Sequence, residues 1–138
     1  MNIVCDANII IAALLGSRAT LTIITSQNHS FYAPRKIVDE IMKHRHLICE
    51  RGGQSPPEFD ENLDALLVFI NVLEYGKYKE FVEKSTVLLE SRDKKDADYL
   101  ACAFSINADF IWTNDEDFSV QKLIRTRTTQ QFIDQQKM

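Results

Sequence analysis

The chain has 138 residues, of which 45% are hydrophobic and 26% are charged. This length supports one continuous core, and the balance excludes a disordered or fibrous protein. A net charge of −4 gives no overall field that would attract nucleic acid or an anionic membrane. A polyanion would therefore need local basic side chains and a metal ion to bind. We expect a single domain over residues 1–138.

Neither a membrane segment nor a disulfide framework is predicted. The longest apolar run, Ile9–Leu15, is too short to cross a bilayer, and its acidic upstream flank differs from the basic start of a secretory signal. Three widely spaced cysteines lie among apolar residues (Cys5, Cys49 and Cys102). Their odd number and spacing predict reduced thiols in a cytoplasmic protein, without a zinc site of cysteine type.

The first half of the chain alternates between strand and helix patterns. In order, it predicts a strand at residues 2–6, one or two helices within 7–27, a strand at 30–34, a helix over 35–51 and, after a Gly/Pro break, a helix from residue 58 to 70. Pro34 is well placed to start the helix that follows it. The break itself carries two glycines and two prolines, which favour a turn.

The second half continues the alternation. Residues 70–75 fit either a short edge strand or the end of the preceding helix. There follow helices over 77–91 and 95–107, strands at 108–113 and 123–128, and a last helix over 130–136. Such alternation implies right-handed crossovers between parallel strands. The predicted fold class is a three-layer α/β/α arrangement with a central parallel sheet.

Acidic residues follow two of the predicted strands. Asp6 ends the first strand, and Asp115 and Asp117 come after the strand at residues 108–113. In open α/β sheets, sites form outside the carboxyl ends of the strands. These carboxylates would therefore be neighbours if the two strands are adjacent.

Two helices offer further carboxylates by their spacing. Asp96 lies on the apolar face of its predicted helix, and Glu40 lies beside the apolar stripe of another. Asp98 points nearly opposite to Asp96, toward water. Converging carboxylates would repel one another and raise each other's pKa unless a cation compensates them. An all-oxygen ligand set suits Mg²⁺ or Mn²⁺, which activates water and neutralises charge at a phosphodiester.

These segments together resemble the PIN domain family, which includes VapC-like toxins. The resemblance rests on "VCDANIIIAALL", Glu40 and "DKKDADYLACAFSINADFIWTNDEDF". These segments occur in the same order as in the family and cover essentially the whole chain. The family implies a metal-dependent ribonuclease site at the carboxyl edge of a parallel sheet. Carried over by position, it implies catalytic Asp6, Glu40, Asp96 and Asp115, metal ligands Asp6, Asp96, Asp115 and Asp117, and supporting Asn8 and Thr113. Asp98 departs from several relatives, which carry an apolar residue or Pro there.

The resulting hypothesis is hydrolysis of a single-stranded or looped RNA. The metal would be held by the aspartates, and Glu40 would place or deprotonate the attacking water. Basic side chains would guide the RNA, with Arg35, Lys36, Lys43 and Lys95 as the main candidates and Arg45, Arg92, Lys94, Arg125 and Arg127 as further members. Unpaired bases would stack on Tyr32 or Trp112 if either ring is exposed.

Structural explanations compete with these assignments. Asp6 would also serve as a helix N-cap, Glu40 as an ion-pair partner of His44 or Lys43, and Asp117 as a turn residue. An aspartyl-phosphate protein also places Asp after its first strand, but it needs further acidic and lysine positions that are not found here. A catalytically inactive PIN-like domain that binds RNA or protein is the alternative function.

The expected partners are an RNA substrate, an antitoxin protein and a second copy of the chain. An antitoxin is implied by the family, many of whose members are toxins of toxin–antitoxin pairs. Self-association is suggested by the apolar run Leu66–Phe69, which exceeds a single helix stripe and would fit a core equally well.

Overall fold

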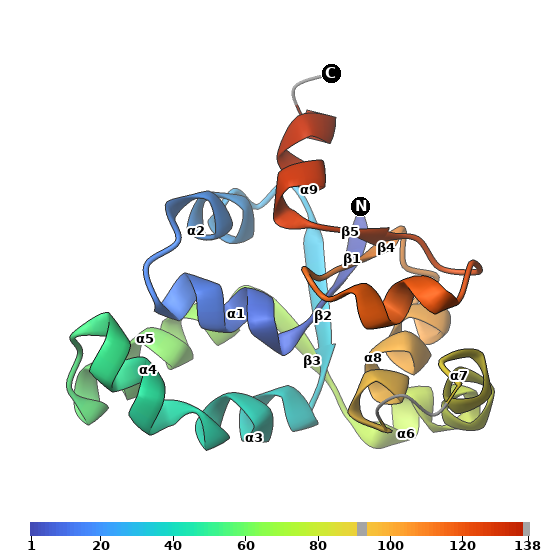
Figure 1. Ribbon diagram of the computed structural model, residues 1–138, viewed down its shortest axis with the longest axis horizontal. Helices are drawn as coiled ribbons and strands as arrows, with labels where there is room; N and C mark the ends of the chain where they lie inside the picture. The colour runs from blue at the N-terminus through green and yellow to red at the C-terminus, as the bar shows by residue number, and fades with distance from the viewer. Residues whose placement is uncertain (91–93, 137–138) are drawn as a thin grey trace.

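The computed structural model describes residues 1–90 and 94–136. Within them, five parallel strands form one sheet in the order β3-β2-β1-β4-β5 (Figure 1). The strands are β1 (Asn2–Cys5), β2 (Ser30–Pro34), β3 (Ile70–Leu73), β4 (Phe110–Trp112) and β5 (Thr126–Arg127). The central β1 pairs with both β2 and β4. The predicted α/β class with a parallel sheet is confirmed.

Helices cover both faces of this sheet (Figure 1). One face carries α1 (Ala7–Leu14), α2 (Arg18–Thr25), α3 (Lys36–Lys43), α4 (Arg45–Gly52) and α5 (Pro56–Leu67). The other carries α6 (Tyr75–Tyr78), the 3₁₀ turn η1 (Lys79–Phe81), α7 (Val82–Leu88) and α8 (Lys94–Ser105). A second 3₁₀ turn, η2 (Glu116–Val120), precedes β5, and α9 (Thr129–Gln136) ends the described chain.

The core is centred on β1, which is buried on both of its faces. Ile3, Val4 and Cys5 are all inaccessible to water. Such two-sided burial explains why this strand is a continuous apolar run instead of an alternating one. α8 packs against β1, β2 and β4, and most of its side chains from Ala97 to Ala103 are buried. The start of α8 is thereby brought to the carboxyl ends of the central strands.

The helix predicted over residues 35–51 is two helices. It breaks at His44, whose φ of −101° and ψ of 8° are outside the helical range, so that α3 ends and α4 begins there. Of the one or two helices predicted within residues 7–27, the structure has two, which are separated at Gly16, where a φ of +99° favours glycine. Because of these breaks, α1, α3 and α4 are separate short helices that contact one another.

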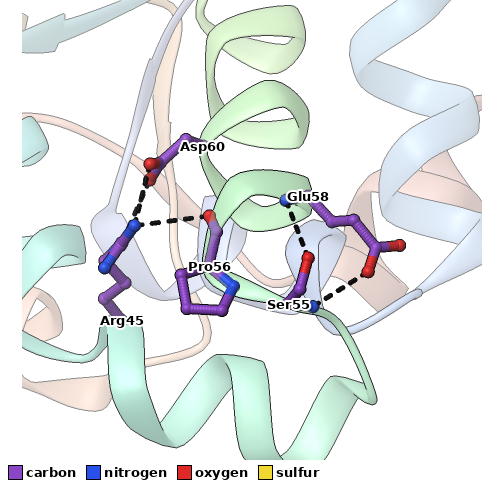
Figure 2. A network of polar contacts seen from close by, with 5 residues as sticks. All are labelled: Arg45, Ser55, Pro56, Glu58 and Asp60. Atoms are coloured by element: carbon purple, nitrogen blue, oxygen red, sulfur yellow. Dashed lines mark hydrogen bonds and ion pairs between the residues drawn. The ribbon is translucent and has the colours of Figure 1, made fainter.

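α5 begins two residues earlier than predicted, because Ser55 caps it (Figure 2). The Ser55 hydroxyl accepts a hydrogen bond from the Glu58 amide, and the Glu58 carboxylate accepts one from the Ser55 amide. Such a capping box tolerates proline in the first helical turn, where no intrahelical donor is needed. Arg45 of α4 binds both carboxylate oxygens of Asp60 and the carbonyl of Pro56, which joins α4 to α5.

Residues 70–75, left open between strand and helix, contain the edge strand β3. The apolar run before it is largely core, since Leu66 is buried and Leu67 and Phe69 pack against the core, while Val68 is exposed. Within the described residues, no single helix is long and apolar enough to cross a membrane. α1 and α2 meet that criterion only as a pair, across a bend of 113°.

Candidate active site

The carboxyl ends of β1 and β4 lie side by side and carry the first acidic residues. Asp6 directly follows β1, and its amide donates a 3.1 Å hydrogen bond to the carbonyl of Trp112 at the end of β4. Asp115 follows the last residue of β4 by three positions and is the N-cap of η2. The two strands are therefore adjacent, which was the condition for Asp6 and Asp115 to be neighbours.

A chain of hydrogen bonds connects the acidic residues of this edge. The Thr113 hydroxyl donates to Asp6 Oδ2 at 2.8 Å and accepts from the Asp115 amide at 3.0 Å. Asp115 Oδ1 in turn accepts from the Asp117 amide at 2.9 Å. One hydroxyl thus joins the carboxylate of Asp6 to the backbone of Asp115, and the Asp115 carboxylate in turn holds the amide of Asp117.

Asp6 is the most buried of these carboxylates. Burial raises its pKa above the ordinary value of 3.8, and the neighbouring Asp115 carboxylate raises it further. The Thr113 hydroxyl and the backbone amides of Ala7 and Asn8 act in the opposite direction. Asp6 occupies the N-cap position of α1, yet its side chain makes no capping hydrogen bond. Helix capping alone therefore does not account for a buried, repelled carboxylate at this position.

Three further carboxylates form a compact group. Single carboxylate oxygens of Asp96, Asp115 and Asp117 all lie within 4.8 Å of one another, and all three side chains are partly buried. Asp96 comes from the first turn of α8, whereas the other two surround the start of η2. Hard oxygen donors at this spacing fit a divalent cation such as Mg²⁺ or Mn²⁺.

Glu40 reaches the same edge from α3. Its Oε2 accepts a 3.0 Å hydrogen bond from the Tyr99 hydroxyl of α8, so the carboxylate is held across the site from the opposite helix layer. Burial, followed by the charge of Glu40, raises the pKa of Tyr99 far above its ordinary value of 10.0. This shift favours the protonated hydroxyl, which is the form that donates to Glu40.

These side chains enclose a polar pocket of about 170 Å³. Its lining is Asp6, Ala7, Asn8, Ile11, Glu40, Lys43, His44, Asp96 and Asp115. The four residues predicted to be catalytic all belong to this lining, and so does Asn8. Asp117 is absent from this lining but belongs to the oxygen cluster described above, and its amide donates to Asp115.

Asp98 does not point to water, contrary to the sequence-based expectation. The residue is 7% exposed, and its carboxylate accepts a 2.9 Å hydrogen bond from the Tyr78 hydroxyl and forms a 3.2 Å ion pair with Lys36. The expectation was wrong because α6 and α7 cover the side of α8 that helix spacing assigned to solvent.

The predicted RNA-guiding residues differ in their availability. Arg35 is ion-paired with Glu74, Lys36 with Asp98, and Arg45 with Asp60. Lys43 lines the acidic pocket and forms no ion pair within the described residues. Arg92 and the side chains of Lys94 and Lys95 lie outside the described part of the chain.

Two further basic candidates lie away from the pocket, and one aromatic candidate is buried. Arg125 and Arg127 line a separate cavity with Asp109 and Asp134, near the amino ends of the strands. Trp112 is fully buried, and its indole NH donates to Thr129, so the ring is inaccessible to a base.

Sequence reasoning missed two residues at this site. One is Tyr99, which lies three positions after Asp96 on α8. Residues at this spacing are neighbours on a helix surface, so the position of Asp96 indicates that Tyr99 is near the site. The other is His44, which lies at the break between α3 and α4 and lines the pocket from there. The continuous helix predicted over residues 35–51 does not indicate this break.

Comparisons with known proteins agree with this fold. Residues 4–136 match the family model of the PIN domain. The structure of VapBC2 from Rickettsia felis, bound to a DNA fragment from its promoter, has a TM-score of 0.72 at 14% identity and covers 93% of this chain and 98% of that one. PAE2754 from Pyrobaculum aerophilum has a TM-score of 0.71 at 16% identity, covering 98% and 88% respectively. At these identities the two structures show a shared fold alone. A search of curated proteins finds no match.

Proposed function

Since the chain belongs to the PIN domain family, we propose that it is a metal-dependent endoribonuclease that hydrolyses RNA phosphodiester bonds with Mg²⁺ or Mn²⁺. The observation that carries the proposal is the clustering of Asp96, Asp115 and Asp117 oxygens within 4.8 Å, beside the buried Asp6. Such a group of carboxylates is costly without a cation, and the donor set matches the cations that assist phosphoryl chemistry.

Each acidic residue has a role in this proposal. Asp6, Asp96 and Asp115 would hold the cation, with Asp117 as a fourth ligand or as support for Asp115. A cation held there would supply charge neutralisation at the scissile phosphate and a lower pKa for the attacking water. Glu40 orients that water and accepts its proton, in a position set by the Tyr99 hydroxyl.

The remaining pocket residues position substrate and ligands. Thr113 fixes the Asp6 carboxylate through its 2.8 Å hydrogen bond. Asn8, exposed in the first turn of α1, is placed to donate to a ligand carboxylate or to the RNA. Lys43 supplies a positive charge at the pocket that is not neutralised by an ion pair within the described residues. It is therefore the basic candidate best suited to hold a phosphate.

We also propose that the chain is the toxin of a toxin–antitoxin pair. Support comes from its fold similarity to VapBC2 of Rickettsia felis. The partner would be an antitoxin protein that covers the acidic pocket, and a second copy of the chain is a further candidate partner. Co-expression with the product of a neighbouring small gene, followed by co-purification and a cleavage assay, tests this part.

The ribonuclease is tested by cleavage of a panel of structured RNAs with Mg²⁺, with Mn²⁺ and with chelator. Asp96→Asn and Asp115→Asn should each lower the cleavage rate at least about 100-fold, because each removes a charged cation ligand. The matched control is Asp64→Asn, at an exposed position of α5 outside the pocket lining.

The results separate the proposal from its alternative. Cleavage that persists in chelator, or that is equal in Asp96→Asn and Asp64→Asn, would contradict the mechanism. If all proteins are inert, Mn²⁺ titration by calorimetry decides whether the carboxylates form a cation site. An absence of Mn²⁺ binding by the wild type would favour a catalytically inactive binding module.

A further inference from the structure

A second groove begins where the acidic pocket ends. It lies between α1 and α4, has a volume of about 170 Å³, and is apolar along Ile11, Leu15 and Leu47. Leu15 and Leu47 are 41% and 42% exposed. The groove therefore offers an apolar surface that the described part of the chain leaves open to solvent.

The groove and the acidic pocket are continuous. Asn8, Ile11 and His44 line both of them, so one molecule can occupy the two at once. His44 lies at the junction, exposed, at the break between α3 and α4. Its ring makes no hydrogen bond, ion pair or ring contact with any described residue, which leaves it able to pack against a ligand.

Cationic side chains accompany this path. Lys43 lines the acidic pocket and Arg51 lines the far end of the groove. Neither forms an ion pair within the described residues, in contrast to Arg35, Lys36 and Arg45. Apolar and ring surfaces between two available cations match a nucleotide, with its base on the apolar part and its phosphates on the cations.

We propose that the groove between α1 and α4 binds the nucleobase adjacent to the scissile phosphate and so selects unpaired RNA. The inference rests on the proposed ribonuclease function and adds a specificity-determining subsite to it. A base held within a duplex cannot enter the groove while its phosphate lies in the acidic pocket, so the base must be unstacked or extruded. Leu15, Leu47 and His44 would contact the base.

A nucleobase fits this groove better than a protein segment does. Its volume suits a single ring system, whereas an amphipathic helix needs a longer apolar surface with anchors on successive turns. The adjoining pocket is lined by four carboxylates, and in the proposed reaction it holds a cation and the phosphate of the substrate. Continuity with that pocket therefore favours the substrate as the occupant.

The test measures binding of fluorescent single-stranded hexanucleotides by anisotropy, with Ca²⁺ as a cation that supports binding while limiting cleavage. Each oligonucleotide is compared with an abasic chain of the same backbone. Leu47→Ser and Leu15→Ser should weaken binding of the base-bearing RNA about five- to tenfold and leave the abasic chain unaffected. Leu123→Ser, at a leucine that is 61% exposed and outside the groove, is the matched control and should change neither.

Three results would overturn the subsite. They are equal binding of base-bearing and abasic chains, equal affinity of Leu47→Ser and Leu123→Ser, and no RNA binding by the wild type. A fourth comes from light scattering, since a wild-type dimer that Leu47→Ser converts to a monomer would assign the groove to a second copy.

The subsite and the nuclease can fail separately. If metal-dependent cleavage occurs while the groove variants keep the wild-type affinity and choice of cut site, the subsite alone is wrong. If cleavage is absent while base-dependent binding is lost in Leu47→Ser, the groove is an RNA-binding surface and the nuclease is wrong.

Discussion

The Thr113 hydroxyl bridges Asp6 and Asp115, since it donates to the carboxylate of the first and accepts from the amide of the second. Thr113 is 1% exposed, so water cannot easily replace it. A single buried hydroxyl therefore links the end of β1 to the turn after β4, because it holds the carboxylate of Asp6 and the backbone of Asp115.

Thr113→Val should lower both stability and activity. The substitution keeps the shape but leaves the Asp115 amide and the Asp6 carboxylate without this partner, which costs about 1–3 kcal/mol in the free energy of unfolding. Thr113→Ser restores the hydroxyl and should retain most of the cleavage rate. Thr86→Val is the control, because the Thr86 hydroxyl only bonds the Val82 carbonyl of its own helix. Urea unfolding and RNA cleavage are the measurements, and equal cleavage by the valine and serine variants of Thr113 would contradict the role.

Asp6 should make the metal-free protein less stable as the pH rises. Its pKa is raised above 3.8 in the folded protein, first by burial and then by Asp115. The folded state therefore holds this proton more tightly than the unfolded state does. Its contribution to stability is fully present below pH 3.8 and is lost as the pH rises through the raised pKa.

Asp6→Asn removes that dependence. In chelator at pH 7, the variant should unfold at a higher urea concentration than the wild type, and the difference should shrink toward pH 4. Mn²⁺ should stabilise the wild type more than the variant, since only the folded wild type carries the full set of ligands. A variant that is less stable than the wild type at pH 7 in chelator would contradict this account of Asp6.

Tyr99→Phe should slow cleavage more than it destabilises the protein. It removes the hydroxyl that donates to Glu40 Oε2, and a loss of about 1 kcal/mol in the free energy of unfolding is expected. The cleavage rate should fall about tenfold or more, because a displaced Glu40 no longer orients the attacking water. Tyr75→Phe is the control, at an exposed tyrosine whose hydroxyl makes no hydrogen bond with the described residues. Wild-type kcat in Tyr99→Phe would exclude the positioning role.

Replacement by methionine should affect different properties at Lys36 and Lys43, namely stability at the first and RNA binding at the second. Lys36→Met leaves the buried Asp98 with Tyr78 but without its cation, so the free energy of unfolding should fall by about 1–3 kcal/mol. Lys43→Met should leave stability within about 0.5 kcal/mol of the wild type and weaken RNA binding, with a smaller salt dependence. Urea unfolding measures the stability, and RNA binding at several salt concentrations measures the salt dependence. Wild-type stability in Lys36→Met would contradict the role of Lys36, and an unchanged salt dependence in Lys43→Met would contradict the role of Lys43.

The sequence alone determined the parallel α/β arrangement and the places where acidic residues follow strands. Both depend on local patterns, namely apolar runs of strand length and Asp at strand ends. Such patterns can be recognised without knowledge of distant contacts. Helix spacing also placed Asp96 on an inward face, where it meets Asp115 and Asp117.

Only the tertiary structure decided which side chains meet across layers. Asp98 became buried because α6 and α7 cover its side of α8, and Lys36 became its partner from α3. Tyr99 met Glu40 because two helix layers converge at one edge of the sheet. His44 reached the pocket because a helix breaks at its own position. These relationships depend on packing between segments far apart in the chain, and periodicity within a single segment carries no information about its neighbours.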